Sequence, residues 1–404
     1  MVKSLHLLET IASRIGDVED RRIYLTREAV GGAIDDPAEA VIRALASPLA
    51  YPPLADSIVP GDRVAIALGA DVPQAIEIVR GAVEAFARAG VDAEACSIVA
   101  VNEELGQLCR TAFDGKDAPH VSVVVHDPDD EKLLCFFGVN RRKEPLVVNR
   151  TIFEADVVLP IGRAKPYGGA FESLFPQFSS AAVIEQFRTP ANRATLAARK
   201  LLRRQISQAG ERIGAPMLVQ VVPGPGDSAA EIVAGESRRV AHSMAEKYRQ
   251  RWSQLAARRA SVVIATVTGG PLSQTWANVG RALAAAGQLV DDEGAIAICT
   301  NLDRSLGESM GRLVGQTNPD KVMRKVFHEH AEDSWAAWQI ARALARSPVY
   351  FMSQLEADAV EEMGLAPVSD IDELVRLAGR RESTIVLEDA QSALAVIERE
   401  LADE

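Results

Sequence analysis

The residues best suited to chemistry follow the apolar segment 157–161. They are Lys165, Tyr167 and Glu172, with Gly168 and Gly169 between the last two. A lysine near the end of a strand can bind a substrate anion, and a tyrosine can serve as an acid or base. Each has an ordinary interpretation as well: an exposed lysine, a packed aromatic ring, a solvated carboxylate and a glycine turn. We predict catalytic roles for the lysine, the tyrosine and the glutamate, with those alternatives open.

A fourth candidate, His126, follows the apolar segment 121–125 and precedes Asp127. Histidine supplies a neutral base near pH 7, so His126 joins the predicted catalytic residues. A polar pair at this place also serves as a simple strand-exit cap, which is the more common role.

A second cluster begins at Gly269-Gly270. A glycine turn before a helix can bind an anion through backbone N–H groups at the helix N-terminus. Arg281 lies seven residues after Gln274, two helical turns on, so their side chains can share a face. We therefore predict a substrate-binding set of five residues: Gly269, Gly270, Gln274, Asn278 and Arg281.

Other polar groups have simpler explanations. His328 and His330 could bind a metal, but they lie on a charged helical face and are interpreted as surface residues. The basic residues of segment 199–204 are interpreted as a solvated helix face. No metal ligand is predicted.

The elements that position these residues alternate between apolar strands and amphipathic helices. Strands are predicted at 63–68, 96–101, 121–125 and 157–161, with a helix at 73–89. This order predicts a mainly parallel α/β sheet, whose ligands lie at the C-terminal ends of the strands. A second α/β unit follows, with strands at 261–267, 295–300, 349–352 and 384–387. We predict two domains, 1–265 and 266–404.

Composition excludes several classes of protein. The net charge of −12 argues against nucleic acid as a partner, because phosphate binding needs a basic face. No apolar run reaches the roughly 18 residues that a membrane span needs. Four cysteines without a Cys-x-x-Cys pair predict buried thiols in a reducing cytoplasm. The expected partner is a small anionic molecule, and the oligomeric state is left open.

Several fragments in order resemble the nickel-pincer lactate racemase family. They are Val64–Val101, His126-Asp127, Phe137-Gly138, Val148–Arg150, Thr268–Gln274, Trp338-Gln339, Val349–Ser353 and Met363–Leu365. The resemblance covers most of the chain. It implies two Rossmann-like α/β domains with the active site in the cleft between them.

The resemblance also implies a chemistry. In that family a lysine binds a nickel-pincer nucleotide covalently, and a histidine coordinates the nickel. Further histidines act as acid and base on the carbon of a 2-hydroxy acid. Imidazole suits nickel, and it titrates near neutral pH.

This sequence departs from the family pattern at the residues that would hold the cofactor. Tyr167 stands where the family has its nickel-ligand histidine, and Glu172 falls at the pincer lysine. A glutamate cannot form the amide bond that anchors the cofactor. Segments 99–103 and 185–187 lack the other two histidines, and 67–71 lacks an arginine. We therefore predict no cofactor, and specifically no covalently bound pincer nucleotide.

Two positions of the second cluster are conservatively changed. Asn278 and Arg281 stand where the family has a glutamine and a lysine. The resemblance thus implies a divergent racemase or epimerase acting on a small 2-hydroxy acid. The alternative is an inactive relative that binds a small anion or scaffolds a partner.

These assignments predict where the ligand pocket lies. A pocket is predicted between the domains, with 165–169 on one side and 269–281 on the other. Because Glu172 would repel a bound anion, we also expect it either to pair with a cation or to turn away.

Overall fold

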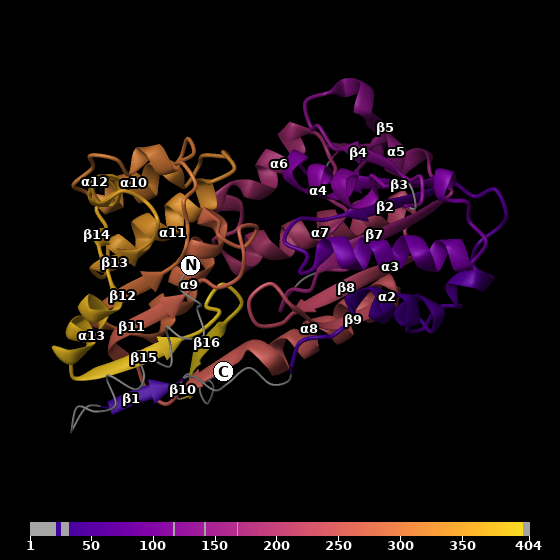
Figure 1. Ribbon diagram of the computed structural model, residues 1–404. Helices are drawn as coiled ribbons and strands as arrows, with labels where there is room; N and C mark the ends of the chain where they lie inside the picture. The colour runs from indigo at the N-terminus through magenta and orange to yellow at the C-terminus, as the bar shows by residue number, and fades with distance from the viewer. Residues whose placement is uncertain (1–21, 26–31, 116–117, 141–142, 168, 399–404) are drawn as a thin grey trace. The chain divides into compact units, whose positions relative to one another are not determined.

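The computed structural model in Figure 1 describes residues 22–25, 32–115, 118–140, 143–167 and 169–398, with the backbone alone for 22–25. Two units divide the chain. The N-terminal unit comprises 31–187 and 194–249, and the C-terminal unit comprises the chain from Gln250 onward together with 188–193 and the strand β1 (Arg22–Leu25). The division lies earlier than the predicted boundary at 265, which falls inside a strand. That strand belongs to the C-terminal sheet because both of its neighbours lie there.

The N-terminal unit is built on a six-stranded sheet. Its strands run in the order β4-β3-β2-β7-β8-β9, all parallel except β9, which is antiparallel to β8. The four strands predicted for this sheet are confirmed. Their bounds are β2 (Val64–Leu68), β3 (Cys96–Ala100), β4 (Ser122–Val125) and β7 (Val157–Arg163), followed by β8 (Met217–Pro223) and β9 (Ala229–Glu236).

Helices cover this sheet, and several begin at a side-chain cap. Asn102 accepts a hydrogen bond from the Leu105 backbone N–H at the start of α4, and Thr195 does the same for Ala198 at the start of α7. Gly214, with φ +79°, ends α7 in the left-handed conformation that glycine adopts without strain. The bounds are α2 (Pro37–Ala46), α3 (Ala75–Arg88), α4 (Glu103–Phe113), α5 (Arg150–Glu154), α6 (Ala181–Arg188), α7 (Leu196–Ile213) and α8 (Ser237–Trp252).

A hairpin that the sequence analysis did not predict lies beside this sheet. It pairs β5 (Leu134–Val139) with β6 (Pro145–Asn149) in antiparallel fashion. Phe136 within it is 61% exposed, so the alternation of buried and exposed side chains that announces a strand is weak here.

The C-terminal unit has a second six-stranded sheet, and all of its neighbouring strands are parallel. The order is β1-β15-β11-β12-β13-β14. The bounds are β11 (Ala260–Thr266), β12 (Val290–Cys299), β13 (Val349–Met352), β14 (Ala366–Pro367) and β15 (Ser383–Leu387), with a separate small ladder of β10 (Ser253–Ala256) and β16 (Leu394–Ile397). The predicted α/β fold class is confirmed in both units.

Helices of the C-terminal unit pack closely on this sheet. Trp276 stacks on Phe351 with ring centroids 6.0 Å apart in its core. A Cβ added at Gly280 would lie 3.1 Å from the Ala336 Cα, so the glycine allows α9 and α11 to approach. The bounds are α9 (Trp276–Leu289), α10 (Pro319–Val326), α11 (Ser334–Leu344), α12 (Ala357–Glu362) and α13 (Ile371–Gly379).

All four cysteines are unpaired thiols. Cys96, Cys109 and Cys299 are buried, as predicted, whereas Cys135 is partly exposed. Burial raises the pKa of Cys96 and Cys109 to about 11 and the pKa of Cys299 to about 12. These three groups therefore remain neutral thiols at physiological pH.

Candidate functional site

The loop that leaves β7 brings two of the predicted catalytic residues together. The Lys165 ammonium lies 3.1 Å from a carboxylate oxygen of Glu172, and the Gly169 backbone N–H donates to the other oxygen at 2.9 Å. Of the two arrangements expected for Glu172, pairing with a cation or turning away, the structure has the ion pair. Glu172 is mostly buried, whereas half of the Lys165 side chain is exposed. Gly168 lies outside the described residues.

Gln177, which the sequence analysis missed, connects this loop to the loop after β2. Its side-chain amide donates to the Glu172 carbonyl at 2.8 Å, and its side-chain oxygen accepts from the Ala70 backbone N–H at 2.8 Å. Two neighbouring strands thus have their C-terminal loops tied together by one amide group. This edge of a parallel sheet is where α/β proteins bind ligands.

Tyr167 opens onto a cavity of about 480 Å³ between α7 and α8. Its side chain is 60% exposed. The Arg203 guanidinium lies 6.0 Å from the centre of the tyrosine ring, and Arg249 donates to the Pro166 carbonyl at 2.7 Å. His242 also lines the cavity.

The electrostatics of this cavity favour an anion. Arg238 lines it too but pairs with Glu211, which leaves Arg203 and Arg249 as the cations without an ion pair among the described residues. From the sequence, the stretch containing Arg203 was interpreted as a solvated helix face. The cavity could not be predicted, because its two walls, α7 and α8, are separated in the chain by the strands β8 and β9 and meet only in the folded protein.

His126 is placed differently from the other three candidates. It is 4% exposed, and its Nε2 lies 2.9 Å from the Ser179 carbonyl oxygen. Its Nδ1 is 3.4 Å from the Asn149 side-chain nitrogen, and Phe178 packs against the ring. Nε2 therefore carries the proton donated to the carbonyl, and Nδ1 accepts. Burial lowers the pKa of His126 below its usual value, so the ring is neutral.

This geometry gives His126 a packing role. Both ring nitrogens have partners, and among the described residues none of those partners is Lys165, Tyr167 or Glu172. The catalytic role predicted for His126 remains a prediction that its surroundings do not favour.

In the C-terminal unit, Gln274 holds the Gly-Gly loop in place. Its side-chain nitrogen donates to the Gly269 carbonyl at 3.0 Å, and its oxygen accepts from Thr300 Oγ1 at 2.7 Å and the Asn301 backbone N–H at 2.9 Å. Gly269 has φ +95°, a conformation that favours glycine. Gln274 therefore positions the loop that also carries Gly270, and its own polar atoms are occupied.

Asn278 and Arg281, which are one helical turn apart near the start of α9, are joined by a hydrogen bond. The Asn278 amide donates to the Ser273 carbonyl at 2.7 Å, and its oxygen accepts from Arg281 Nη1 at 2.6 Å. Asn278 is buried, whereas Arg281 is partly exposed. Asn278 thereby orients the Arg281 guanidinium, a group that can donate two parallel N–H bonds to a carboxylate.

Arg304, also missed by the sequence analysis, braces the same loop. It donates to the Gln274 carbonyl at 3.0 Å and to the Pro271 carbonyl at 3.2 Å. The predicted substrate-binding residues are therefore gathered into one hydrogen-bonded cluster at the C-terminal end of β11.

Comparison with known proteins places this architecture. A family model described as the lactate racemase N-terminal domain matches residues 10–189, and one described as the lactate racemase C-terminal domain matches residues 255–398. The chain belongs to the lactate racemase family. Sequence comparison with curated proteins finds no match.

Solved structures share the fold of this family member. The lactate racemase apoprotein from Thermoanaerobacterium thermosaccharolyticum superposes with a TM-score of 0.76 at 21% identity, covering 94% of this chain and 96% of that one. A protein from Thermotoga maritima superposes with a TM-score of 0.67 at 12% identity, covering 91% of this chain and 100% of that one.

The described part of this lactate racemase family member contains no grouping of three or more His, Cys, Asp or Glu side chains placed to hold a metal ion. No helix within it has the length and apolarity that crossing a membrane requires.

The C-terminal unit has one more polar cluster, at the point where the strand order reverses between β11 and β15. The Thr268 hydroxyl donates to the Asp389 carboxylate, and the Gln391 amide donates to both at 3.3 Å. Asp389 has φ +47°, which is uncommon for a residue with a side chain. This switch point is the usual ligand position in open α/β sheets, and the sequence analysis did not identify it.

Proposed function

We propose that this chain binds a small carboxylate of the 2-hydroxy acid type, without a nickel-pincer cofactor anchored on a lysine. The observation that carries the binding of a carboxylate is the position of Arg281, which is held by the buried Asn278 at the start of α9. An arginine with an oriented guanidinium can bind a carboxylate through two parallel N–H···O bonds.

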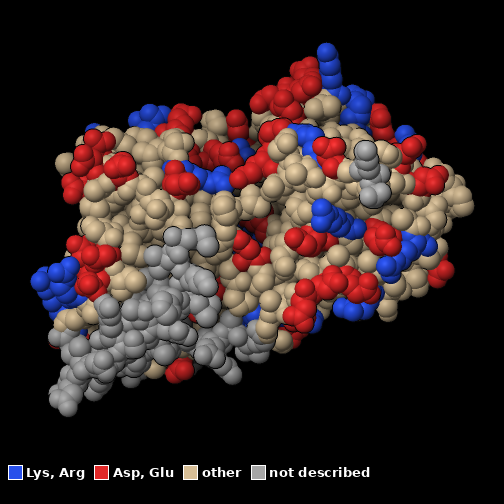
Figure 2. All heavy atoms as spheres, in the orientation of Figure 1, with Lys and Arg blue, Asp and Glu red and all other residues tan. Residues whose placement is uncertain are grey.

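The charge of the protein makes this local cation important. The net charge is −12, and Figure 2 shows acidic side chains spread over the visible face of both units, with basic ones between them. Such a surface repels a small anion at long range. Binding therefore depends on clusters such as Arg281 with the N–H groups of the Gly-Gly loop.

Three considerations support the absence of a pincer cofactor anchored on a lysine. The resemblance places Glu172 at the position of the anchoring lysine, and the nearby Lys165 is paired with Glu172. Tyr167 stands where the resemblance places the nickel ligand, and a phenol is a poor substitute for imidazole at that metal. His126, the imidazole that follows β4, is buried with both nitrogens occupied. These residues do not suit the pincer group.

A ligand screen tests the binding proposal. Thermal unfolding of the wild type is measured with 2-hydroxy acids and sugar acids, and each compound that stabilises it is repeated on Arg281→Ala, Lys165→Ala and the control Arg324→Ala, on α10. A ligand at a hundredfold excess over its Kd stabilises by about 2.7 kcal/mol. We expect Arg281→Ala to lose most of the shift and Arg324→Ala to keep it. Equal shifts in all variants would place the ligand elsewhere.

The cofactor proposal has its own test. The protein is produced together with the cofactor-synthesis enzymes of the family, and its intact mass is measured. We expect the mass of the unmodified chain. A mass increment that maps to Lys165 would show that this lysine, not the position of Glu172, is the anchor.

A racemase or epimerase is the second candidate. Tyr167 and His242 line one cavity with three arginines, so groups able to move a proton lie beside groups able to bind an anion. Ligands found in the screen separate the two candidates when they are incubated with the protein in deuterium oxide. An enzyme that moves the C2 proton incorporates deuterium there, and a binding protein does not.

A further inference from the structure

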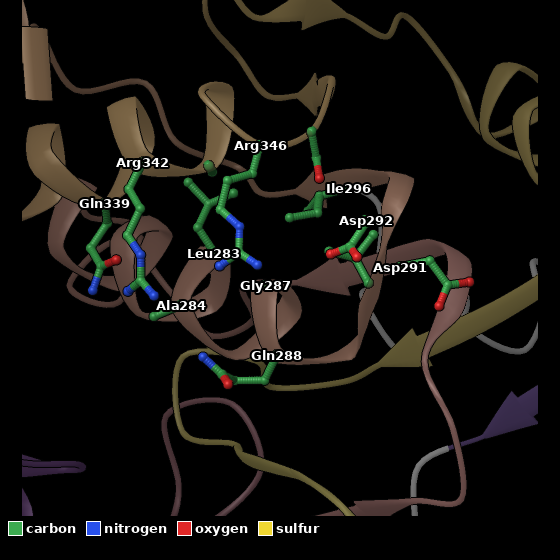
Figure 3. A pocket seen from close by; sticks show the side chains of 13 residues that line it. Leu283, Ala284, Gly287, Gln288, Asp291, Asp292, Ile296, Gln339, Arg342 and Arg346 are labelled. Atoms are coloured by element: carbon green, nitrogen blue, oxygen red, sulfur yellow. The ribbon is translucent and has the colours of Figure 1, made fainter. Parts of the chain in front are cut away.

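A small cavity lies at the other end of α9 from the Gly-Gly loop. It has a volume of about 40 Å³, is open to solvent on one side, and is lined by the second half of α9, β12 and the end of α11 with the residues that follow it. Figure 3 shows its lining side chains. The lining begins on α9 at Leu283 and includes none of the predicted substrate-binding residues, which are Gly269, Gly270, Gln274, Asn278 and Arg281. The cavity therefore does not belong to the site described above.

Two arginines face this cavity. Arg342 lies in the last turn of α11 and Arg346 follows its C-cap, and Figure 3 shows both guanidinium groups extending toward Ala284 and Gly287 of α9. Neither has an ion pair with any residue that the structure describes. The aliphatic and planar parts of Arg342 pack on Trp338, with the guanidinium carbon 5.5 Å from the ring centre.

The electrostatics of the pair are unfavourable when the cavity holds only water. Burial, and secondly the charge of Arg346, lower the pKa of Arg342. The two like charges repel each other, and a bound anion would offset that repulsion by attracting both guanidinium groups.

The remaining polar groups narrow the choice of anion. Gln339, which is buried, and Gln288 contribute uncharged amide groups to the lining. Asp292 lines the cavity with its carboxylate turned toward the arginines in Figure 3, whereas Asp291 points away from them. A carboxylate beside an anion site repels a fully deprotonated anion but accepts a hydrogen bond from one that carries a proton.

We propose that this cavity binds a phosphate group, with Arg342 and Arg346 on its unprotonated oxygens and Asp292 accepting from its P–OH. The volume admits only a few atoms of water size, which suits inorganic phosphate, whose dianion keeps one P–OH at neutral pH. Sulfate has the same shape but no proton at neutral pH, so it is expected to bind more weakly.

The position of the two arginines at the end of α11 has an alternative explanation that predicts no phosphate binding. Cations in the last turn of a helix interact favourably with its C-terminal carbonyl groups. If that is their whole role, they need no ligand and no saturable phosphate binding occurs.

Isothermal titration calorimetry on the full chain tests the proposal. The wild type is titrated with inorganic phosphate, glycerol phosphate and sulfate in a buffer free of all three. We expect one saturable phosphate site and a sulfate affinity lower by about tenfold or more. Glycerol phosphate, which is mostly a dianion without a P–OH at neutral pH, is expected to bind as weakly as sulfate, and an affinity equal to that of phosphate would contradict the role of Asp292.

Variants assign the site. Arg342→Gln and Arg346→Gln are each expected to weaken phosphate binding by about tenfold or more. The control Arg376→Gln removes an exposed arginine of α13 and should bind as the wild type does. Asp292→Asn should raise sulfate affinity toward that of phosphate, a gain that unfolding cannot mimic. The proposal is overturned if phosphate does not saturate by about 10 mM, if both arginine variants bind normally, or if wild type binds sulfate equally well.

Discussion

Burial lowers the pKa of His126, and the same burial makes the residue a determinant of stability. Its ring donates to Ser179, accepts from Asn149 and packs on Phe178. The folded-state pKa lies below the ordinary value of 6.5. Above pH 6.5 both the folded and unfolded proteins have a neutral ring there. As the pH falls below 6.5, the unfolded chain gains a proton first, and stability is lost.

Replacing His126 by Asn should therefore have two effects. At pH 7.5 the free energy of unfolding should fall by about 1–3 kcal/mol, because buried hydrogen-bonding groups lose their partners. Between pH 6.5 and the lower folded-state pKa, the loss of stability with falling pH should be shallower than in wild type. Urea unfolding at pH 7.5 and 5.5 measures both. A variant as stable as wild type would contradict the packing role and revive the catalytic one.

Lys165 and Glu172 show how far residue types alone can be taken. An ion pair was one of the two arrangements expected for Glu172, because its carboxylate would repel a bound anion, and Lys165 supplies the cation. Nothing in the local sequence indicates that Gln177 joins this loop to Ala70, because that contact spans more than a hundred residues. Local chemistry was predictable, and its long-range support was not.

At the scale of elements, the loop after β7 is held by close contact with α7. A Cβ added at Gly210 would come within 2.0 Å of Phe171, a buried residue of the loop. That distance is too short for any side-chain carbon. Glycine is therefore required at this position because the Phe171 side chain packs directly against the helix backbone, and not because of the backbone conformation. The contact also fixes one wall of the cavity that contains Tyr167.

Gly210→Ala should consequently destabilise the protein by about 1–3 kcal/mol, the usual cost of overpacking. The matched control is Gly287→Ala on α9, where a Cβ would meet nothing within 4 Å. There the substitution should stabilise by roughly 0.5–1 kcal/mol, as alanine is the better helix former. Chemical unfolding of the two variants measures the difference. Similar effects of both would mean that the Phe171 contact carries no energy.

Elements were predictable where burial is continuous. The runs that became β2, β3, β7 and β11 are apolar, as is β12 from Ala295 on, and their central residues are buried on both faces of a parallel sheet. The first part of β12 was not predicted, because it is acidic and exposed. The hairpin of β5 and β6 and the edge strand β9 escaped detection, because their residues are only partly buried. The Gly-Gly loop and Arg281 were identified from spacing. Arg203 and Arg249 were not, because only packing of α7 near α8 brings them to one cavity.

At the scale of the whole molecule, the chain does not divide at one point in the sequence. The strand β1, near the N-terminus, pairs with β15 in the C-terminal unit, with Arg22 opposite Ser383 and Leu25 opposite Val386. The predicted division at a single boundary missed this, since four residues carry too little periodicity to reveal their partner. One edge of the C-terminal sheet is thereby covered by a strand from the opposite end of the chain.

Deleting residues 1–25 should therefore weaken the C-terminal unit and leave the N-terminal one intact. The backbone groups of β15 that now pair with β1 would lose their partners and open more readily to solvent. Hydrogen exchange followed by mass spectrometry should show exchange in 383–387 accelerated by about tenfold or more. Segments 64–68 and 96–100, in the sheet of the other unit, provide the internal control and should keep their wild-type rates. Equal acceleration in both sheets would mean that the two units unfold as one, and no acceleration would mean that β1 contributes nothing to the edge it covers.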